Sequence, residues 1–191
     1  NLFFEKYISL NKKQKIVDIY KEAKDKDILE IKKYKSIKNL KFIEYPKLGF
    51  KELNKVTKII SKKGGGILLI DYGYLESKNK STLQSIYEHK KNYIFNNLGK
   101  ADITYLVNFK LLKEFFIKNN LKVKKIVSQK FFLEKMGIKE RADQISKKMP
   151  FKEKVNLYLR LKRLVDERFM GSLFKVIFAY KFRKNNFFGF K

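Results

Sequence analysis

The chain has no cysteine and only one histidine, His89. Without cysteine it can form no disulfide, no thiolate nucleophile and no cysteine-ligated zinc site. With one histidine, a multi-histidine metal centre would need ligands from a partner, and so would a serine triad that needs a spare histidine. Candidate chemistry in this chain therefore has to come from carboxylates, tyrosines and short polar side chains.

Long apolar runs are also missing. A helix that crosses a bilayer needs about 18 or more consecutive apolar residues, and no such run is present. The first residues show no signal-peptide pattern. We therefore expect no membrane span and a cytoplasmic protein. The chain begins at Asn1 inside a strand-like segment and without an initiator methionine, so we also expect it to be a fragment.

Acidic residues are scarce, with 19 aspartates and glutamates against 46 lysines and arginines and a formal charge of +27. Such a charge suits binding to nucleic acid or a membrane surface. Most of it is lysine, which is spread over every segment alongside abundant Ile, Asn and Phe, as a low-GC genome would encode. Nucleic-acid binders more often concentrate arginine and aromatic residues on one surface. A basic nucleic-acid-binding module is therefore only an alternative interpretation.

The dominant motif is the stretch from Gly64 to Tyr74, in which three glycines precede the apolar run Ile67–Ile70. An uninterrupted apolar run suits a strand that is covered on both faces, as in a parallel sheet flanked by helices. In open α/β sheets, ligands bind beyond the carboxyl ends of the strands. The sequence therefore predicts a functional site at Asp71, Tyr72, Gly73 and Tyr74.

Helix and strand patterns alternate along the rest of the chain. Strands Leu2–Leu10 and Ile16–Ile19 are expected to pair, and residues 25–39 are either a short surface helix or an irregular segment. Further helices are predicted at Phe50–Lys62, Asn108–Asn119, Gln129–Met136, Ile138–Lys147 and Phe151–Val165. Further strands are predicted at Leu121–Ser128 and Leu173–Phe182. Three main strands are few for an independent doubly wound fold, so more strands are expected before Asn1.

The expected core includes side chains from several of these elements. The last helix should turn one stripe inward, made of Val155, Tyr158, Leu161 and Val165. Other residues expected in the core are Phe131, Phe132, Met136, Phe174 and Phe178. The tail, residues 184–191, is expected to be frayed.

Five segments together resemble, in order, the carboxyl-terminal half of the MidA-like family: GGGILLIDYGY, STLQSIYEHK, NLGKADITYLVNF, SQKFFLEKMGIKERA and MGSLFKVIFAY. These are class I S-adenosylmethionine-dependent methyltransferases, whose mitochondrial members are arginine methyltransferases needed for respiratory complex I assembly. The resemblance runs from Leu2 to Tyr180. It implies an α/β fold, a partial Rossmann-like class I methyltransferase sheet with flanking helices, in which the amino-terminal cofactor-binding half is missing.

The resemblance also implies how the chain is organised. Residues 1–183 would be the carboxyl-terminal part of one methyltransferase domain, with 1–45 a β-hairpin-like insertion, 46–183 the sheet and helices, and 184–191 a tail. Gly66–Tyr74 would be the fifth strand of the sheet, and Leu121–Ser128 and Leu173–Tyr180 the terminal antiparallel pair. The family's glycine-rich cofactor loop would lie upstream of Asn1. The isolated chain is therefore expected to be inactive.

The function that the resemblance implies is S-adenosyl-L-methionine-dependent methylation of a protein arginine by the intact protein, with a respiratory-complex subunit as one acceptor. A non-catalytic assembly factor is the other alternative. Where the family usually shows His-Val-Asp-Phe, this chain has Leu106, Val107, Asn108 and Phe109. The departures at Leu106 and Asn108 count in favour of that alternative.

The candidate site residues follow from the motif and the resemblance together. Methyl transfer to a guanidinium nitrogen is an in-line displacement helped mainly by positioning, so an acid can hold the cation while aromatic walls exclude water. We predict that Asp71, Tyr72 and His89 are catalytic and that Tyr74, Gln84, Asp102 and Thr104 bind substrate. Each has a structural alternative, since Asp71 could cap the turn, Tyr72 could pack, and short polar residues commonly make turns and caps.

Overall fold

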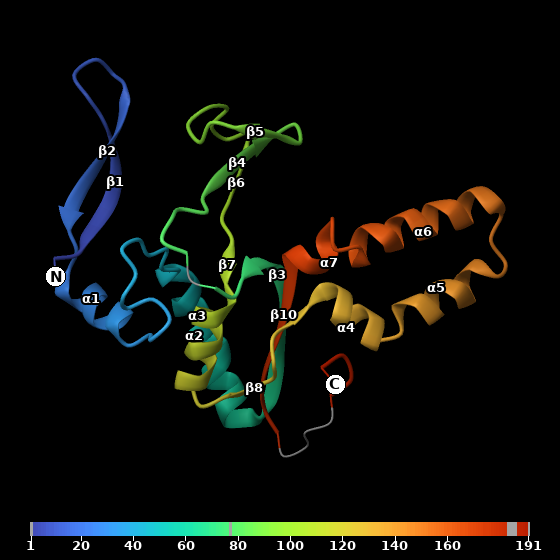
Figure 1. Ribbon diagram of the computed structural model, residues 1–191. Coiled ribbons are helices and arrows are strands. Elements are labelled where there is room, and N and C mark those ends of the chain that lie inside the picture. The colour runs from blue at the N-terminus through green and yellow to red at the C-terminus, as the bar shows by residue number, and fades with distance from the viewer. Residues whose placement is uncertain (1, 77, 183–186, 191) are drawn as a thin grey trace.

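The computed structural model describes residues 2–76, 78–182 and 187–190. The chain begins with β1 (Phe4–Leu10), β2 (Ile16–Glu22), α1 (Asp25–Lys32), α2 (Lys47–Lys63) and β3 (Gly65–Tyr74). It continues with β4 (Gln84–Tyr87), β5 (Lys90–Asn92), β6 (Asp102–Thr104), β7 (Val107–Asn108) and α3 (Phe109–Lys118). The last elements are β8 (Lys122–Val123), β9 (Val127–Ser128), α4 (Gln129–Lys135), α5 (Ile138–Ser146), α6 (Phe151–Val165), α7 (Met170–Leu173) and β10 (Phe174–Lys181). The fold is α/β, as the sequence predicts (Figure 1).

The central sheet has the strand order β7-β3-β10-β8, and β9 also pairs with β10. β3 and β10 run antiparallel, from Tyr72 opposite Phe174 to Gly65 opposite Lys181. The apolar run of β3 suggested a parallel sheet, and that expectation is wrong, because its one parallel neighbour in the described residues is the two-residue β7. The terminal antiparallel pairing that the resemblance implies is confirmed by β8, β9 and β10.

The strand predicted at Leu121–Ser128 is split into β8 and β9. Ala179 lies opposite Val123 and Val176 opposite Val127, so the register slips by one residue between the two pieces. Such a slip is a β-bulge, in which one strand carries an extra residue. The bulge explains why an alternating sequence gives two short strands here.

One face of the sheet carries the main core. Ile67 and Leu69 of β3 lie opposite Ala179 and Ile177 of β10, and these side chains pack against α2 and α3. The aromatic and leucine side chains of α3 are all buried: Phe109, Leu111, Leu112, Phe115 and Phe116.

The opposite face is covered unevenly. Over β10, the ring of Phe178 lies 4.9 Å from that of Phe187, and Phe190 lies 5.2 Å from Phe132 of α4. The chain end at 187–190 is therefore packed and not frayed as expected, while residues 184–186 and 191 lie outside the described residues. Over β3, Leu68 and Ile70 are 44% and 41% exposed. The expectation that β3 is covered on both faces is therefore wrong for the described residues.

Two other core assignments need correction. Phe132 is buried as expected, but Phe131 of α4 and Met136, the C-cap residue of α4, are 38% and 54% exposed. The bounds predicted for α6 are correct, yet none of its residues is buried. α5 and α6 form an arm that extends away from the sheet (Figure 1), so α6 packs against α4, α5 and α7 and its stripe does not enter the main core.

The amino-terminal segment contributes more to the core than its lysine-rich sequence suggests. The predicted hairpin is confirmed as β1 and β2, and α1 is a short helix. Just after α1, Tyr34 and Ile37 are 3% and 1% exposed and join the core beside Phe50, whose ring stacks on that of Phe115 at 4.3 Å. The division of the chain at residue 45 stays a prediction.

A second, three-stranded antiparallel sheet of order β5-β4-β6 projects beyond the carboxyl end of β3, and the sequence did not predict it.

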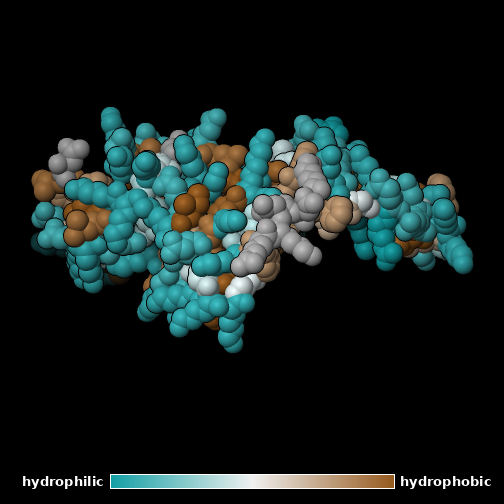
Figure 2. Space-filling model, turned by 90° about the horizontal axis from the view of Figure 1, so that it is seen from below, coloured by the Kyte–Doolittle hydropathy of each residue, from teal (hydrophilic) through white to brown (hydrophobic). Residues whose placement is uncertain are grey.

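The surface seen from below is mainly hydrophilic, with hydrophobic side chains gathered near its middle (Figure 2). Among the described residues, no helix is both long and apolar enough to cross a bilayer.

Candidate functional site

A cavity of about 220 Å³ lies at the carboxyl end of β3, where the sequence predicts a functional site. β3 contributes Asp71 and Tyr74 to its lining, and the segment before α2 contributes Glu44. The remaining walls come from the segment before α3 and from apolar residues of α2 and α3: Tyr105, Leu106, Val107, Asn108, Phe50, Leu53, Leu111 and Leu112. The cavity is therefore mostly apolar, with a few polar groups that converge on it, as ligand sites commonly are.

Asp71 and Tyr72 are neighbours in β3 with different surroundings. The Oδ1 atom of Asp71 accepts a hydrogen bond from the backbone N–H of Tyr72 at 2.8 Å. Successive side chains of a strand point to opposite faces, and Tyr72 packs against Phe174 with ring centroids 5.6 Å apart. Asp71 therefore lines the cavity, whereas Tyr72 does not.

Glu44 is the second carboxylate of the cavity, and sequence reasoning missed it. Its Oε1 atom accepts hydrogen bonds from the Thr82 backbone N–H at 2.8 Å and the Ser81 hydroxyl at 3.2 Å, and its Oε2 atom accepts one from the Thr82 hydroxyl at 2.6 Å. The Thr82 hydroxyl oxygen in turn accepts the N–H of Leu106 at 3.0 Å. One feature of the sequence could have pointed to Glu44 as a site residue: it is an acid between two apolar residues, Ile43 and Tyr45, in a chain with few acids.

Tyr74 is held as a neutral phenol beside these carboxylates. Burial, followed by the negative charge of Glu44, raises its pKa above the usual 10.0, while a hydrogen bond with the side chain of Asn108 acts in the opposite direction. The ammonium group of Lys78 lies 5.0 Å from the centroid of the Tyr74 ring. At neutral pH the hydroxyl of Tyr74 can therefore donate a hydrogen bond.

Asn108, one of the two departures from the family pattern, caps a helix. Its Oδ1 atom accepts the backbone N–H of Leu111 at 3.1 Å, which satisfies one free donor at the start of α3. Aspartate and asparagine are equally good at this position, so the departure preserves the cap. The departure at Leu106 instead places an apolar side chain in the cavity wall.

Replacing Asn108 by alanine is expected to lower the free energy of unfolding by about 1 kcal/mol, because the cap is lost. Asn108→Asp keeps the acceptor and suits the positive helix end, so it should leave that free energy within about 0.5 kcal/mol of the original. Urea denaturation of the intact protein measures both. Equal losses in the two variants would show that the contact of the amide with Tyr74, and not the cap, is what matters.

The other predicted site residues lie on the three-stranded sheet, outside the cavity lining. Gln84 is paired with Thr104, and Asp102 lies opposite Ile86. His89 is exposed and has φ 63° next to Glu88 with φ 48°, the geometry of a two-residue hairpin turn. The structure thus brings Gln84 and Thr104 together but not with Asp71, and the functional roles of these four residues stay predictions.

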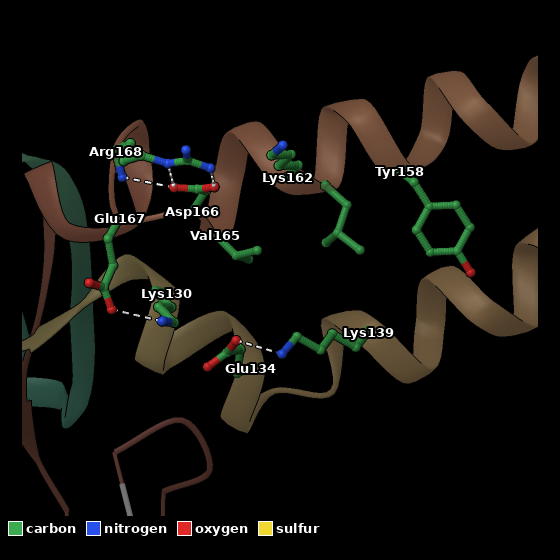
Figure 3. A pocket seen from close by; sticks show the side chains of 10 residues that line it. Lys130, Glu134, Lys139, Tyr158, Lys162, Val165, Asp166, Glu167 and Arg168 are labelled. Carbon is green, nitrogen blue, oxygen red and sulfur yellow. Dashed lines mark hydrogen bonds and ion pairs between the residues drawn. The ribbon is translucent and has the colours of Figure 1, made fainter.

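A larger hollow of about 680 Å³ lies between α4 and α6 (Figure 3). Each acid that lines it is paired with a cation: Glu167 with Lys130 at 2.7 Å, Glu134 with Lys139 at 2.7 Å and Asp166 with Arg168 at 2.8 Å. The hydroxyl of Tyr158 points across to α5, where it donates to Asp143. The Lys130 and Lys139 pairs join α4 to the segment after α6 and to α5, and the Arg168 pair lies within the turn after α6. These structural roles account for the charged groups of this hollow.

The described residues offer no ready site for a metal ion. Among the described residues, no group of three or more histidine, aspartate or glutamate side chains is placed to hold a metal ion. The cavity at the end of β3 holds two carboxylates, an amide and two phenols among apolar walls. Such a set can bind and orient an organic cation, because carboxylates accept its hydrogen bonds and aromatic rings cover its faces.

Comparisons with known proteins agree on one family. Residues 2–127 match the family described as "Putative S-adenosyl-L-methionine-dependent methyltransferase". A Caenorhabditis elegans protein named "Protein arginine methyltransferase NDUFAF7 homolog, mitochondrial" is 32% identical over 89 residues, which are 47% of this chain and 21% of that relative.

Two crystal structures of Burkholderia thailandensis proteins share the fold. One is the structure of an uncharacterised protein, with a TM-score of 0.76 and 19% sequence identity. The match covers 98% of this chain and 50% of the chain in that structure. The other, with S-adenosyl-homocysteine bound, has a TM-score of 0.74 at 19% identity, with 98% and 48% covered. The chain thus spans about half the length of these structures, and its match to the curated relative spans about a fifth of that protein.

Proposed function

Because this chain belongs to the S-adenosyl-L-methionine-dependent methyltransferase family matched above, we propose that it forms the acceptor-binding half of an enzyme that methylates a protein arginine. The observation that carries the proposal is the cavity at the carboxyl end of β3, with Asp71 and Tyr74 in its lining. The name of the Caenorhabditis elegans relative supports arginine as the acceptor residue. A subunit of a respiratory complex is the acceptor protein that the family resemblance favours.

The residues of this chain do not fit the cofactor by themselves. A cavity of about 220 Å³ is smaller than the roughly 300–1,000 Å³ of typical cofactor and small-molecule pockets. The glycine cluster Gly64–Gly66 leads from α2 into β3, whereas a nucleotide-binding glycine loop leads from a strand into a helix. We therefore assign cofactor binding to the half of the fold that the solved relatives have and this chain does not include.

Exposed residues of β3 mark where that other half would join. Leu68 and Ile70 leave apolar surface open on one face, and β7 pairs only with the last residues of β3. In a full methyltransferase sheet, a further strand would pair with the free length of this edge, and helices would cover both side chains. Asp71 would then lie at the junction of the two halves, where cofactor and acceptor have to meet.

Within the cavity, the residues of this chain would bind and orient the acceptor. Arginine carries its charge at all physiological pH values, so the carboxylate of Asp71 can hold it by a charge-assisted hydrogen bond. Tyr74 and the apolar walls exclude water from the reacting nitrogen. Correct placement of the acceptor nitrogen is the main contribution that these groups can make to an in-line displacement.

The test is a methyl-transfer assay of the intact protein. Purified protein is incubated with isotopically labelled S-adenosylmethionine and a cell extract, and labelled residues are identified by hydrolysis and mass spectrometry. The proposal expects labelled methylarginine on a small set of proteins. Label on another residue type, or no transfer by a protein that binds the cofactor, would overturn it, and the second result would favour the non-catalytic assembly factor. The relative is mitochondrial by name, so a cytoplasmic location stays a prediction.

A further inference from the structure

We propose that Glu44 binds the acceptor side chain directly and makes the cavity at the end of β3 selective for an organic cation, the guanidinium group of arginine. The inference rests on the proposed function, because it specifies how the same cavity selects its substrate. Glu44 would then be a specificity-determining residue together with Asp71.

The charge of the cavity lining is opposite to that of the chain. Lysines and arginines outnumber acids by 46 to 19 in the sequence, yet the lining contains Glu44 and Asp71 and, among the described residues, no lysine or arginine. The cation on Tyr74, Lys78, lies over the ring and is not part of the lining. Two acids in a low-dielectric recess focus a negative potential that attracts cations. A lysine-rich composition cannot account for this reversal.

Neither carboxylate is neutralised within the described part of the chain. The hollow between α4 and α6 has acids too, but Glu134, Asp166 and Glu167 each form an ion pair there (Figure 3). Glu44 and Asp71 have no ion pair among the described residues and receive hydrogen bonds from neutral donors only. A partly buried carboxylate without a cation loses solvation that a bound cation would restore.

Glu44 is also held in place before any ligand arrives. Three neutral donors fix its carboxylate, two on Oε1 and one on Oε2. A carboxylate has about four acceptor positions, so about one remains open on Oε2. Because Thr82 also accepts the N–H of Leu106, the segments that carry Glu44 and Leu106 cannot move independently. An acceptor fixed in this way loses little entropy when it binds its ligand.

The shape of the lining favours guanidinium over ammonium. A guanidinium group presents five donors in one plane, so it can reach two carboxylates on different walls, and its faces stack on aromatic rings. Tyr74, Tyr105 and Phe50 supply such rings around the cavity. Leu106 adds an apolar side chain to the same lining and no positive charge.

Ligand-observed NMR on the intact protein tests the inference with two small probes, ethylguanidinium and its neutral isostere ethylurea. We expect the protein to bind ethylguanidinium at least about tenfold more tightly than ethylurea, and Glu44→Gln to remove most of that preference. Glu76→Gln is the matched control, because Glu76 is an exposed acid beyond the end of β3 and does not line the cavity. It should keep the full preference.

A second variant separates ligand binding from a purely structural role of Glu44. Thr82→Val removes the hydroxyl donor at 2.6 Å but keeps the charge of Glu44. It should retain the preference for ethylguanidinium even if the free energy of unfolding falls. Equal loss of preference in Thr82→Val and Glu44→Gln would make Glu44 a structural residue and overturn the inference, as would equal binding of the two probes by the unaltered protein.

The inference and the proposed function fail in different ways. If the intact protein methylates arginine and Glu44→Gln leaves both KM and probe preference unchanged, only the inference is wrong. If the protein prefers ethylguanidinium through Glu44 but transfers no methyl group while binding the cofactor, only the proposed function is wrong.

Discussion

The Asp71→Asn variant of the intact protein is expected to lose about 100-fold in kcat/KM for methyl transfer, with unchanged affinity for S-adenosylmethionine. Truncating one partner of a buried charged hydrogen bond costs about 2–5 kcal/mol, and each 1.4 kcal/mol is about tenfold. Asparagine keeps the size of the side chain and the oxygen that accepts the Tyr72 N–H at 2.8 Å. The loss would therefore report the negative charge and not the local turn.

Two measurements check this prediction: steady-state kinetics with the acceptor found in the labelling experiment, and cofactor titration. Asp102→Asn is the informative control, because Asp102 is also a predicted substrate-binding residue but is exposed on β6, outside the cavity lining. If the cavity is the acceptor site, that control should stay within about threefold of the original activity. An Asp71→Asn variant with undiminished turnover would remove Asp71 from the mechanism.

Helices were predictable because their signals are local. Pro150 precedes α6, and the apolar residues of α3 recur at three- and four-residue spacing, so both helices lie where the sequence places them. What α6 packs against was not predictable. Its apolar stripe has helical spacing, but only the path of the chain decides that α5 and α6 project as an arm and leave Phe151 83% exposed.

The environment of β3 depended on residues far along the chain. Its apolar run indicated a buried strand, and Ile67 and Leu69 do face the core. Its antiparallel partner β10 lies about a hundred residues later, and local periodicity carries no information on that pairing. Leu68 and Ile70 belong to the same apolar run but are exposed among the described residues. An apolar run therefore does not indicate which other parts of the chain, if any, cover each of its side chains.

Only the part of the candidate site that β3 contributes could be predicted from the sequence. Asp71 and Tyr74 were found because polar groups that follow a buried strand lie at the edge where ligands bind. Glu44 was missed because its position at the cavity depends on hydrogen bonds between distant parts of the chain. It accepts a hydrogen bond from Thr82, 38 residues later, and Thr82 accepts one from Leu106, a further 24 residues along the chain. Long-range polar contacts of this kind have no local pattern. They become visible only when the fold brings the three segments together.

Replacing Gly73 by alanine is expected to lower the free energy of unfolding by about 3 kcal/mol or more, the upper end of the cost of overpacking. A Cβ atom at Gly73 would lie 2.2 Å from the carbonyl oxygen of Val107 and 2.8 Å from the ring of Phe109. The first contact is with backbone, so no rotamer change can relieve it, and β7 would have to move away from β3. Chemical denaturation of the intact protein measures the loss.

Gly49→Ala is the matched control, and it is expected to raise the free energy of unfolding instead of lowering it. Gly49 lies in α2, and an added Cβ would meet nothing closer than Pro46 at 3.7 Å, an ordinary contact. Alanine in a helix is favoured over glycine by about 0.5–1 kcal/mol, so this variant should be more stable. Gly73→Ala should also weaken methyl transfer, because β7 carries Asn108 and pairs with Gly73 and Tyr74 at the cavity. If Gly73→Ala were as stable as the original protein, the close pairing of β3 with β7, and with it this wall of the cavity, would be wrong.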